Sequence, residues 1–197
     1  MKEREFWKVC KKLNNEERVD VLRRVMSSMD KDGLPVGQIS GFVRIEQPAT
    51  STYLMQLEND CGLVSSQRAG RYCLYRAEPD HADEKAACLF AALKRYFMKE
   101  THGFEFVNGN RPEKPAFMAV LPALANKVRA KVVGILREKG RMDKPALMKE
   151  TGLGELNISR HMACIVECGL SGIEDGAYVW REPDDEIARL FIQLSKS

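Results

Sequence analysis

An internal repeat constrains this chain more than any other feature. Segment 13–22, which begins Leu-Asn-Asn-Glu-Glu-Arg, lines up with segment 124–133, which begins Leu-Ala-Asn-Lys-Val-Arg. Segment 51–63, Ser-x-x-Leu-x-x-Leu followed by Cys-Gly-Leu, corresponds to 159–170, with one extra residue before the glycine in the first copy. Gly-x-Tyr and then Glu-Pro-Asp follow in both copies. Ordered self-similarity of this kind predicts two domains built alike.

Each copy predicts the same order of secondary structure. Asn15 and Asn126 are suitable N-caps for a first helix, because apolar residues recur at helical spacing after both. A short second helix, a third helix and two short strands around a glycine turn follow. The second helices are expected at 36–43 and 144–151, the latter ending on Gly152, and the third at 48–62 and 156–169; the hairpins surround Arg68-Ala-Gly70 and Glu174-Asp-Gly176. This order is that of a winged helix.

The predicted fold class is therefore mainly α with small β-hairpin wings (α+β), arranged as tandem winged helix-turn-helix domains. Glycines and prolines concentrate between the copies, which indicates an irregular connection. We expect a first domain at 1–100, a linker at 101–117 that holds the isolated His102, and a second domain at 118–197. Apolar stripes on a helix at 83–99 and at both ends of the chain fit either local core packing or an interface.

Composition excludes several classes of protein. With 44% hydrophobic residues and 31 basic against 28 acidic groups in 197 residues, the chain is too apolar and too weakly charged for disorder. No apolar run is long enough to span a membrane, and the charged start does not resemble a secretory signal. Six cysteines without CxxC pairing favour reduced thiols, so we expect a cytoplasmic location.

Net charge leaves the partner undecided. The pI is near 8.5, whereas a dedicated nucleic-acid-binding domain often exceeds about 9. Residues 1–110 hold 17 basic and 16 acidic groups, and residues 111–197 hold 14 and 12, so neither half is basic overall. The placement of individual charges matters more than their sum.

The repeated segments resemble the ArsR-like winged-helix transcriptional regulators. In that family the helix after the turn carries Ser-x-His-Leu and ends in Gly-Leu before the wing. The second copy has Ser159-Arg-His161-Met and a later Cys-Gly-Leu, while the first copy has Tyr53 in place of the histidine. The resemblance covers most of the chain outside 101–118. It implies a DNA-binding repressor, with two copies forming an intramolecular pseudo-dimer or two chains forming a homodimer.

Both copies offer side chains suited to double-stranded DNA. Polar groups on the third helix can reach base edges in the major groove, and basic groups on the wing can reach phosphates. The first copy offers Gln47, Thr50, Ser51, Thr52, Tyr53, Gln56, Arg68 and Arg71, and the second offers Asn157, Ser159, Arg160 and His161. The second wing carries Glu174 and Asp175, which phosphates repel. We therefore expect the first domain to be the stronger reader.

A winged-helix module that binds a protein partner instead of DNA is the alternative, favoured by the acidic second wing and modest net charge. The helices that precede the third helices lack cysteine, and only Cys164 and Cys168 form a local pair, which we interpret as buried packing residues. No metal or other cofactor is expected, and the effector stays open. Because no catalytic motif occurs, an enzyme is not expected.

Overall fold

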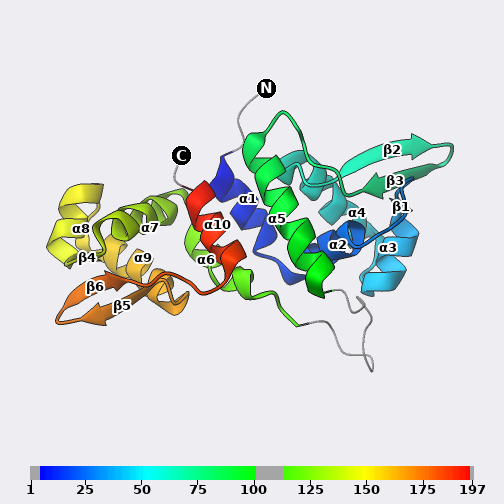
Figure 1. Cartoon of the computed structure of the whole chain (residues 1–197). Coiled ribbons are helices and arrows are strands. Elements are labelled where there is room, and N and C mark those ends of the chain that lie inside the picture. Colours follow the sequence, from blue (N-terminus) through cyan, green and yellow to red (C-terminus); the bar gives the residue numbers. More distant parts are fainter. Residues whose placement is uncertain (1–4, 101–112, 196–197) are drawn as a thin grey trace. The chain divides into compact units, whose positions relative to one another are not determined.

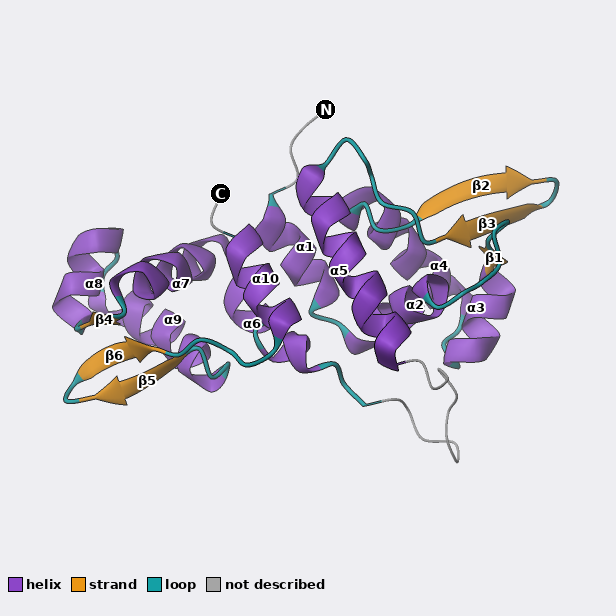
Figure 2. Ribbon diagram, in the orientation of Figure 1, coloured by secondary structure: helices purple, strands orange, loops and turns teal. Residues whose placement is uncertain are grey.

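The computed structural model describes residues 5–100 and 113–195 (Figure 1). Residues 101–112, which include most of the predicted linker and His102, lie outside the described part. The chain forms two compact units, one built from Asn15–Lys114 and the other from Phe6–Asn14 with Pro115–Ser197. It is mainly helical with two small antiparallel sheets, so the expected α+β class is confirmed (Figure 2).

The first unit contains a three-stranded sheet in the order β1-β3-β2, together with four α-helices in the described residues. Its elements are α2 (Glu16–Met26), β1 (Leu34–Pro35), α3 (Val36–Val43), α4 (Gln47–Gln56), the π-helical turn η1 (Leu57–Cys61), β2 (Ser65–Ala69), β3 (Tyr72–Arg76) and α5 (Glu84–Glu100). Helix α2 contacts α3, α4 and α5, and the core of this unit includes the buried Leu22, Leu89 and Leu93.

The second unit repeats this order and adds further helices. Its elements are α1 (Phe6–Leu13), the 3-10 helix η3 (Ala116–Ala119), α6 (Leu121–Leu124), α7 (Lys127–Lys139), β4 (Arg141–Met142), α8 (Lys144–Thr151), α9 (Glu155–Glu167), β5 (Ser171–Glu174), β6 (Ala177–Trp180) and α10 (Glu186–Leu194). Its sheet has the order β4-β6-β5, which matches the first unit strand for strand. The short strands β1 and β4 were missing from the sequence prediction, because two residues show no periodicity.

Two asparagines, Asn15 and Asn126, cap the N-termini of the helices where the sequence predicted them. The Asn15 side-chain oxygen accepts a hydrogen bond from the Arg18 N–H at 2.8 Å, and the Asn126 oxygen accepts from the Val128 and Arg129 N–H groups at 3.0 Å each. These bonds satisfy backbone donors that the first turn of a helix leaves unpaired. The predicted N-caps of α2 and α7 are therefore confirmed.

The extra residue of the first copy is absorbed at the end of its third helix. The Leu63 N–H donates to the Leu57 carbonyl, six positions back, whereas the Leu170 N–H donates to the Ile165 carbonyl, five positions back. The π-helical turn η1 widens the helix by one residue, while α9 stays α-helical to Glu167. In both units a glycine with a left-handed backbone, Gly62 or Gly169, follows the third helix, and the hairpin begins after it.

A three-residue turn joins the second and third helices in both units. It begins at Arg44 in the first unit and at Gly152 in the second, and both have left-handed backbones with φ of 55° and 73°. Glycine adopts this conformation without steric cost, whereas other residues experience a clash between Cβ and the backbone. The predicted C-terminal glycine of α8 is confirmed at Gly152.

We expect Gly152→Ala to lower the free energy of unfolding by about 1 kcal/mol, because alanine is strained at this φ. Gly134→Ala is the matched control, since Gly134 lies inside α7 and a Cβ there meets nothing within 4 Å. That variant should gain about 0.5–1 kcal/mol from higher helix propensity. Urea unfolding followed by circular dichroism measures both. Equal shifts of the same sign would contradict the assigned backbone conformations.

Helix α1 belongs to the second unit, which corrects the expected boundary of 1–100. The Phe6 ring lies 5.9 Å from the Phe191 ring, and Phe117 stacks on Phe191 at 5.5 Å between centroids. Phe117 is 1% exposed, so the end of the predicted linker 101–117 is core rather than connection. Sequence proximity assigned these segments to other parts, although a shared aromatic cluster holds them together.

The apolar stripes pack within their own units. On α5, Ala86, Phe90, Leu93 and Phe97 are buried, and the Arg23 guanidinium lies 5.4 Å from the Phe97 ring. The α10 stripe also lies largely inside its unit. For the α5 and α10 stripes, local core packing is the reading observed, whereas the α1 stripe is buried against elements of the second unit and not of the expected first domain. In the described residues, no helix combines the length and the apolar character that crossing a membrane requires.

Candidate nucleic-acid interface

Helix α4 presents a polar surface to solvent, but one of the residues predicted to contact DNA is buried instead. Gln47 and Thr52 are exposed and Ser51 is half-buried. Thr50, expected to face outward, is 0% exposed, and its hydroxyl donates to the Ile45 carbonyl at 3.4 Å. It shares the inner face of the helix with Leu54, four positions on. Thr50 is therefore a packing residue, and its prediction as a DNA contact was wrong.

Tyr53 ties the third helix to the first helix of its unit. Its hydroxyl donates to Glu17 Oε2 at 2.6 Å, and the Arg18 guanidinium lies 5.0 Å from its ring centroid. The hydrogen bond to the Glu17 carboxylate, together with burial, raises the pKa of Tyr53. Because its hydroxyl already has a partner, Tyr53 positions α4 against α2.

His161 occupies the corresponding place in the second unit. It is half-buried on α9, and burial followed by the nearby Arg129 charge lowers its pKa. The imidazole is therefore neutral at physiological pH and cannot act as a phosphate-binding cation. Both units thus place the arginine of the first helix, Arg18 or Arg129, beside the aromatic residue of the third.

The polar and basic residues of α9 differ in exposure. Asn157 and Arg160 are exposed, and Ser159 is half-buried. In the first unit, Gln56 is half-buried and its Oε1 atom has no hydrogen-bond partner among the described residues. The sequence reasoning missed two exposed apolar side chains on these helices, Met55 at 47% and Leu156 at 64%. Helical position alone did not separate them from the core residues.

The first hairpin carries two exposed arginines that form no ion pair within the described residues. Arg68 lies on β2 opposite Cys73, and Arg71 follows Gly70 in the two-residue turn between β2 and β3. Gly70 has a φ of 60°, which a type II′ hairpin turn requires at its first central position. The tip of this hairpin therefore presents two uncompensated positive charges, with Tyr72 67% exposed beside them.

The second hairpin is electrically balanced. Asp175 and Gly176 form its turn, with φ of 48° and 74°, as in a type I′ Asp-Gly turn. Arg141 Nη2 lies 3.4 Å from Asp175 Oδ2 and donates to the Glu174 carbonyl at 3.1 Å, while Arg181 Nη2 lies 3.9 Å from Glu174 Oε1. The sequence showed the two acids but missed their basic partners, because the sheet brings Arg141 there from β4.

Cys164 on α9 and Cys168 directly after it have the features of packing residues. Cys164 and Cys168 are both half-buried, and burial followed by the neighbouring Cys164 raises the pKa of the Cys168 thiol to about 11. A thiol with this pKa is protonated at neutral pH and is a poor nucleophile and metal ligand. Across residues 5–100 and 113–195, no three His, Cys, Asp or Glu side chains converge as a metal site would need.

Each unit thus brings together a short helix, a three-residue turn, a solvent-facing third helix and a hairpin. Comparison with known protein families, curated proteins and solved structures gives no match. The function must therefore be inferred from the chemistry of these surfaces.

Proposed function

We propose that the chain is a sequence-specific, double-stranded-DNA-binding transcriptional regulator, acting as a repressor, in which each unit is a winged helix-turn-helix domain. One observation carries the proposal: the helix, three-residue turn, helix and hairpin occur twice with the same sheet order. This arrangement places a third helix and a hairpin on every unit. The exposed residues of α4 and of the first hairpin have the chemistry that duplex DNA requires.

In the proposed binding mode, the third helix contacts the major groove and the wing contacts phosphates. An α-helix about 10–12 Å across fits the major groove, which is about 12 Å wide. Gln47 and Thr52 are the exposed predicted residues of α4. The Gln47 amide can hydrogen-bond to base edges or phosphates, whereas the Thr52 hydroxyl donates to the Pro48 carbonyl at 2.9 Å and can accept a hydrogen bond from a base. Arg68 and Arg71 on the wing provide the sequence-independent attraction to phosphate oxygens.

The two domains are unequal in this proposal. The first wing has two arginines that form no ion pair within the described residues, whereas the acids of the second wing form ion pairs with its neighbouring arginines. In the second domain, exposed Asn157 and Arg160 on α9 supply groove contacts. Having two such helices in one chain makes an intramolecular pseudo-dimer the simpler arrangement, with a homodimer as the other.

Salt dependence of duplex binding tests the proposal. We expect the full chain to bind a pool of random-sequence duplexes at low salt and to enrich a specific sequence on repeated selection. Each neutralised phosphate contributes about −0.9 to the slope of log affinity against log salt, so Arg68, Arg71 and Arg160 together predict a slope of about −3 or steeper. Fluorescence anisotropy measures this slope. No binding at low salt would contradict the proposal.

A protein-interaction module is the second candidate function, and the second unit carries the observation that favours it. Leu156 on α9 is 64% exposed and Ile173 on β5 is 63% exposed, next to the compensated acids Glu174 and Asp175. Large exposed apolar side chains bordered by polar groups are typical of surfaces that bind proteins. Failure of every duplex, together with retained folding, would favour this function.

A further inference from the structure

The first unit contains a pocket that the proposed DNA-binding surfaces do not use. Its volume is about 280 Å³, and it lies where the ends of α2 and α5 meet β3 and the chain that follows α2. Val25 and Met26 line it from α2, Tyr75 from β3 and Lys94 from α5. These three elements belong to one compact unit, so the pocket is built into a single domain.

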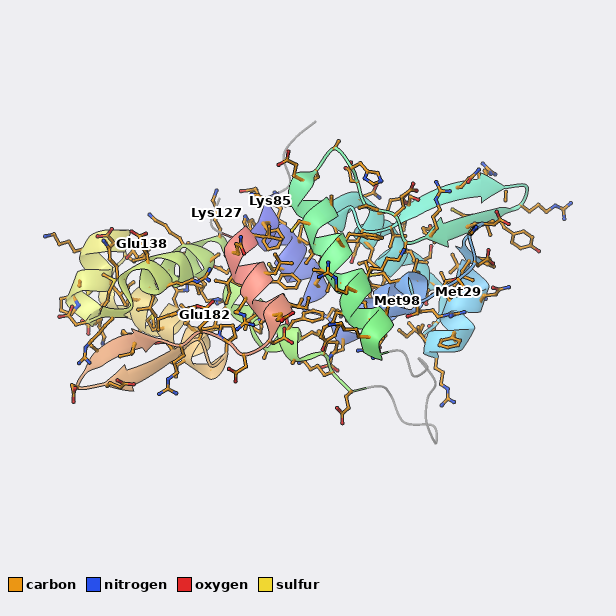
Figure 3. The ribbon with its side chains drawn as sticks, in the orientation of Figure 1. Met29, Lys85, Met98, Lys127, Glu138 and Glu182 are labelled. Carbon is orange, nitrogen blue, oxygen red and sulfur yellow. The ribbon has the colours of Figure 1, made fainter. Side chains whose placement is uncertain are left out.

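The buried residues that line the pocket are mainly apolar, and two of the exposed lining residues are methionines. Val25 and Met26 are each 1% exposed and Tyr75 is 6% exposed, whereas Met29 is 85% and Met98 is 44% exposed. Figure 3 labels both methionines, Met98 near the end of α5 and Met29 on the chain after α2. Methionine adapts its shape to an apolar ligand, and two exposed methionines at one pocket are unusual on a surface that stays in contact with water.

The charges around the pocket favour an anion. Lys31 and Lys94 line it, and neither forms an ion pair among the described residues. The Lys94 ammonium lies 5.6 Å from the Phe90 ring centroid. Arg76 also lines the pocket, but Glu78 Oε2, 2.7 Å from its Nε, already compensates its charge.

Three further polar residues line the pocket, and one of them, Ser28, accepts the Asp30 N–H with its hydroxyl oxygen at 3.1 Å. The one carboxylate, that of Asp30, accepts the Asp32 N–H at 3.0 Å. Burial, with a contribution from Cys73, raises the pKa of Tyr75 to about 12. Its hydroxyl is therefore protonated at neutral pH, and its hydrogen-bond partner is Cys73. Two ammonium groups without an ion pair among the described residues thus line the pocket together with a single carboxylate.

We propose that this pocket binds a small amphipathic anion, with an apolar body between the methionines and a carboxylate at Lys31 and Lys94. At about 30 Å³ per water-sized group, the volume holds on the order of ten non-hydrogen atoms. This matches a medium-chain or monocyclic aromatic carboxylate. The proposal goes beyond DNA binding and does not depend on it.

Octanoate is the probe that tests the site. In the full chain labelled with ¹³C at the methionine methyl groups, octanoate should shift the resonances of Met26, Met29 and Met98 in a saturable way. The methionines of the second unit, such as Met142 and Met162, should not shift. Octylammonium has the same chain with the opposite charge, and we expect it to bind at least tenfold more weakly. Equal binding of both probes, or no saturable shift, would overturn the proposal.

Two lysine variants separate specific binding from general attraction. Lys31→Gln with Lys94→Gln should weaken octanoate binding at least tenfold, because both ammonium groups are removed while their stems remain. Lys139→Gln with Lys149→Gln removes the same charge from exposed positions of the second unit and should leave binding unchanged. Since all four lysines are outside the core, the variants should fold normally. A loss of the same size in both pairs would overturn the assignment of the anion to this pocket.

Discussion

Replacing Arg68 and Arg71 together by alanine should weaken duplex binding roughly 100-fold or more, because each hydrogen bond to a charged group contributes about 1.5–3 kcal/mol and about 1.4 kcal/mol is a factor of ten. Both side chains are exposed at the tip of the first hairpin and form no ion pair within the described residues. Neither arginine supports the core, so the free energy of unfolding should change little.

The salt dependence should change in the same variant. Loss of two phosphate contacts lowers the magnitude of the slope of log affinity against log salt by about 1.8. Anisotropy titrations at several salt concentrations measure both the affinity and the slope. A weaker affinity with an unchanged slope would contradict phosphate contact, and would point to a change in the shape of the hairpin instead.

A matched control removes the same charge from another surface of the same unit. Arg95 and Lys99 are exposed on α5, and Arg95→Ala with Lys99→Ala should leave affinity within about threefold, because distant surface charges are screened by salt. Single substitutions then rank the two domains. Arg71→Ala should cost more affinity than Arg160→Ala, and the reverse order would overturn the assignment of the first domain as the stronger reader.

The elements set by local chemistry could be predicted from sequence. Asn15 and Asn126 cap their helices, and Gly152 ends α8, because each signal acts within one turn of the chain. The second helices were predicted at 36–43 and 144–151, the bounds that the structure gives. The repeat made these predictions stronger, because each feature was observed twice.

The misassigned residues are buried by packing that residue polarity and position along the chain did not predict. Thr50 is polar and was placed outward, yet its spacing from Leu54 places it on the buried face of α4, where a backbone carbonyl accepts its hydroxyl. Helix α1 precedes the first unit in sequence but packs on Phe191 of the second. For α1, a contact between distant parts of the chain outweighed the local reading.

The charge of the second hairpin could be predicted only in part. Glu174 and Asp175 are adjacent in sequence and visible at once. Arg141 reaches them because β4 pairs with β6, whose own partner is β5, and a strand of two residues leaves no periodic signal. The sequence therefore indicated a repulsive wing, whereas the structure has one whose charges are paired.

Removing these two acids without changing their shape should raise DNA affinity about tenfold. Glu174→Gln with Asp175→Asn frees Arg141 and Arg181 from their ion pairs and gives the second hairpin the two unpaired arginines of the first. Asn-Gly suits a type I′ turn as well as Asp-Gly does, so the hairpin should keep its conformation. Exposed ion pairs contribute about 0–1 kcal/mol, so stability should change little.

The comparison with a charge-matched variant decides what such a gain means. Glu167→Gln with Asp184→Asn changes the net charge equally at exposed positions outside the hairpin. If the hairpin variant gains affinity and a steeper salt slope while the control does not, Arg141 and Arg181 contact phosphates and the second domain lies on DNA. An equal gain in both variants would reflect only long-range attraction. No gain in the hairpin variant would mean that this hairpin faces away from the duplex, leaving Ile173 and the paired acids to a protein partner.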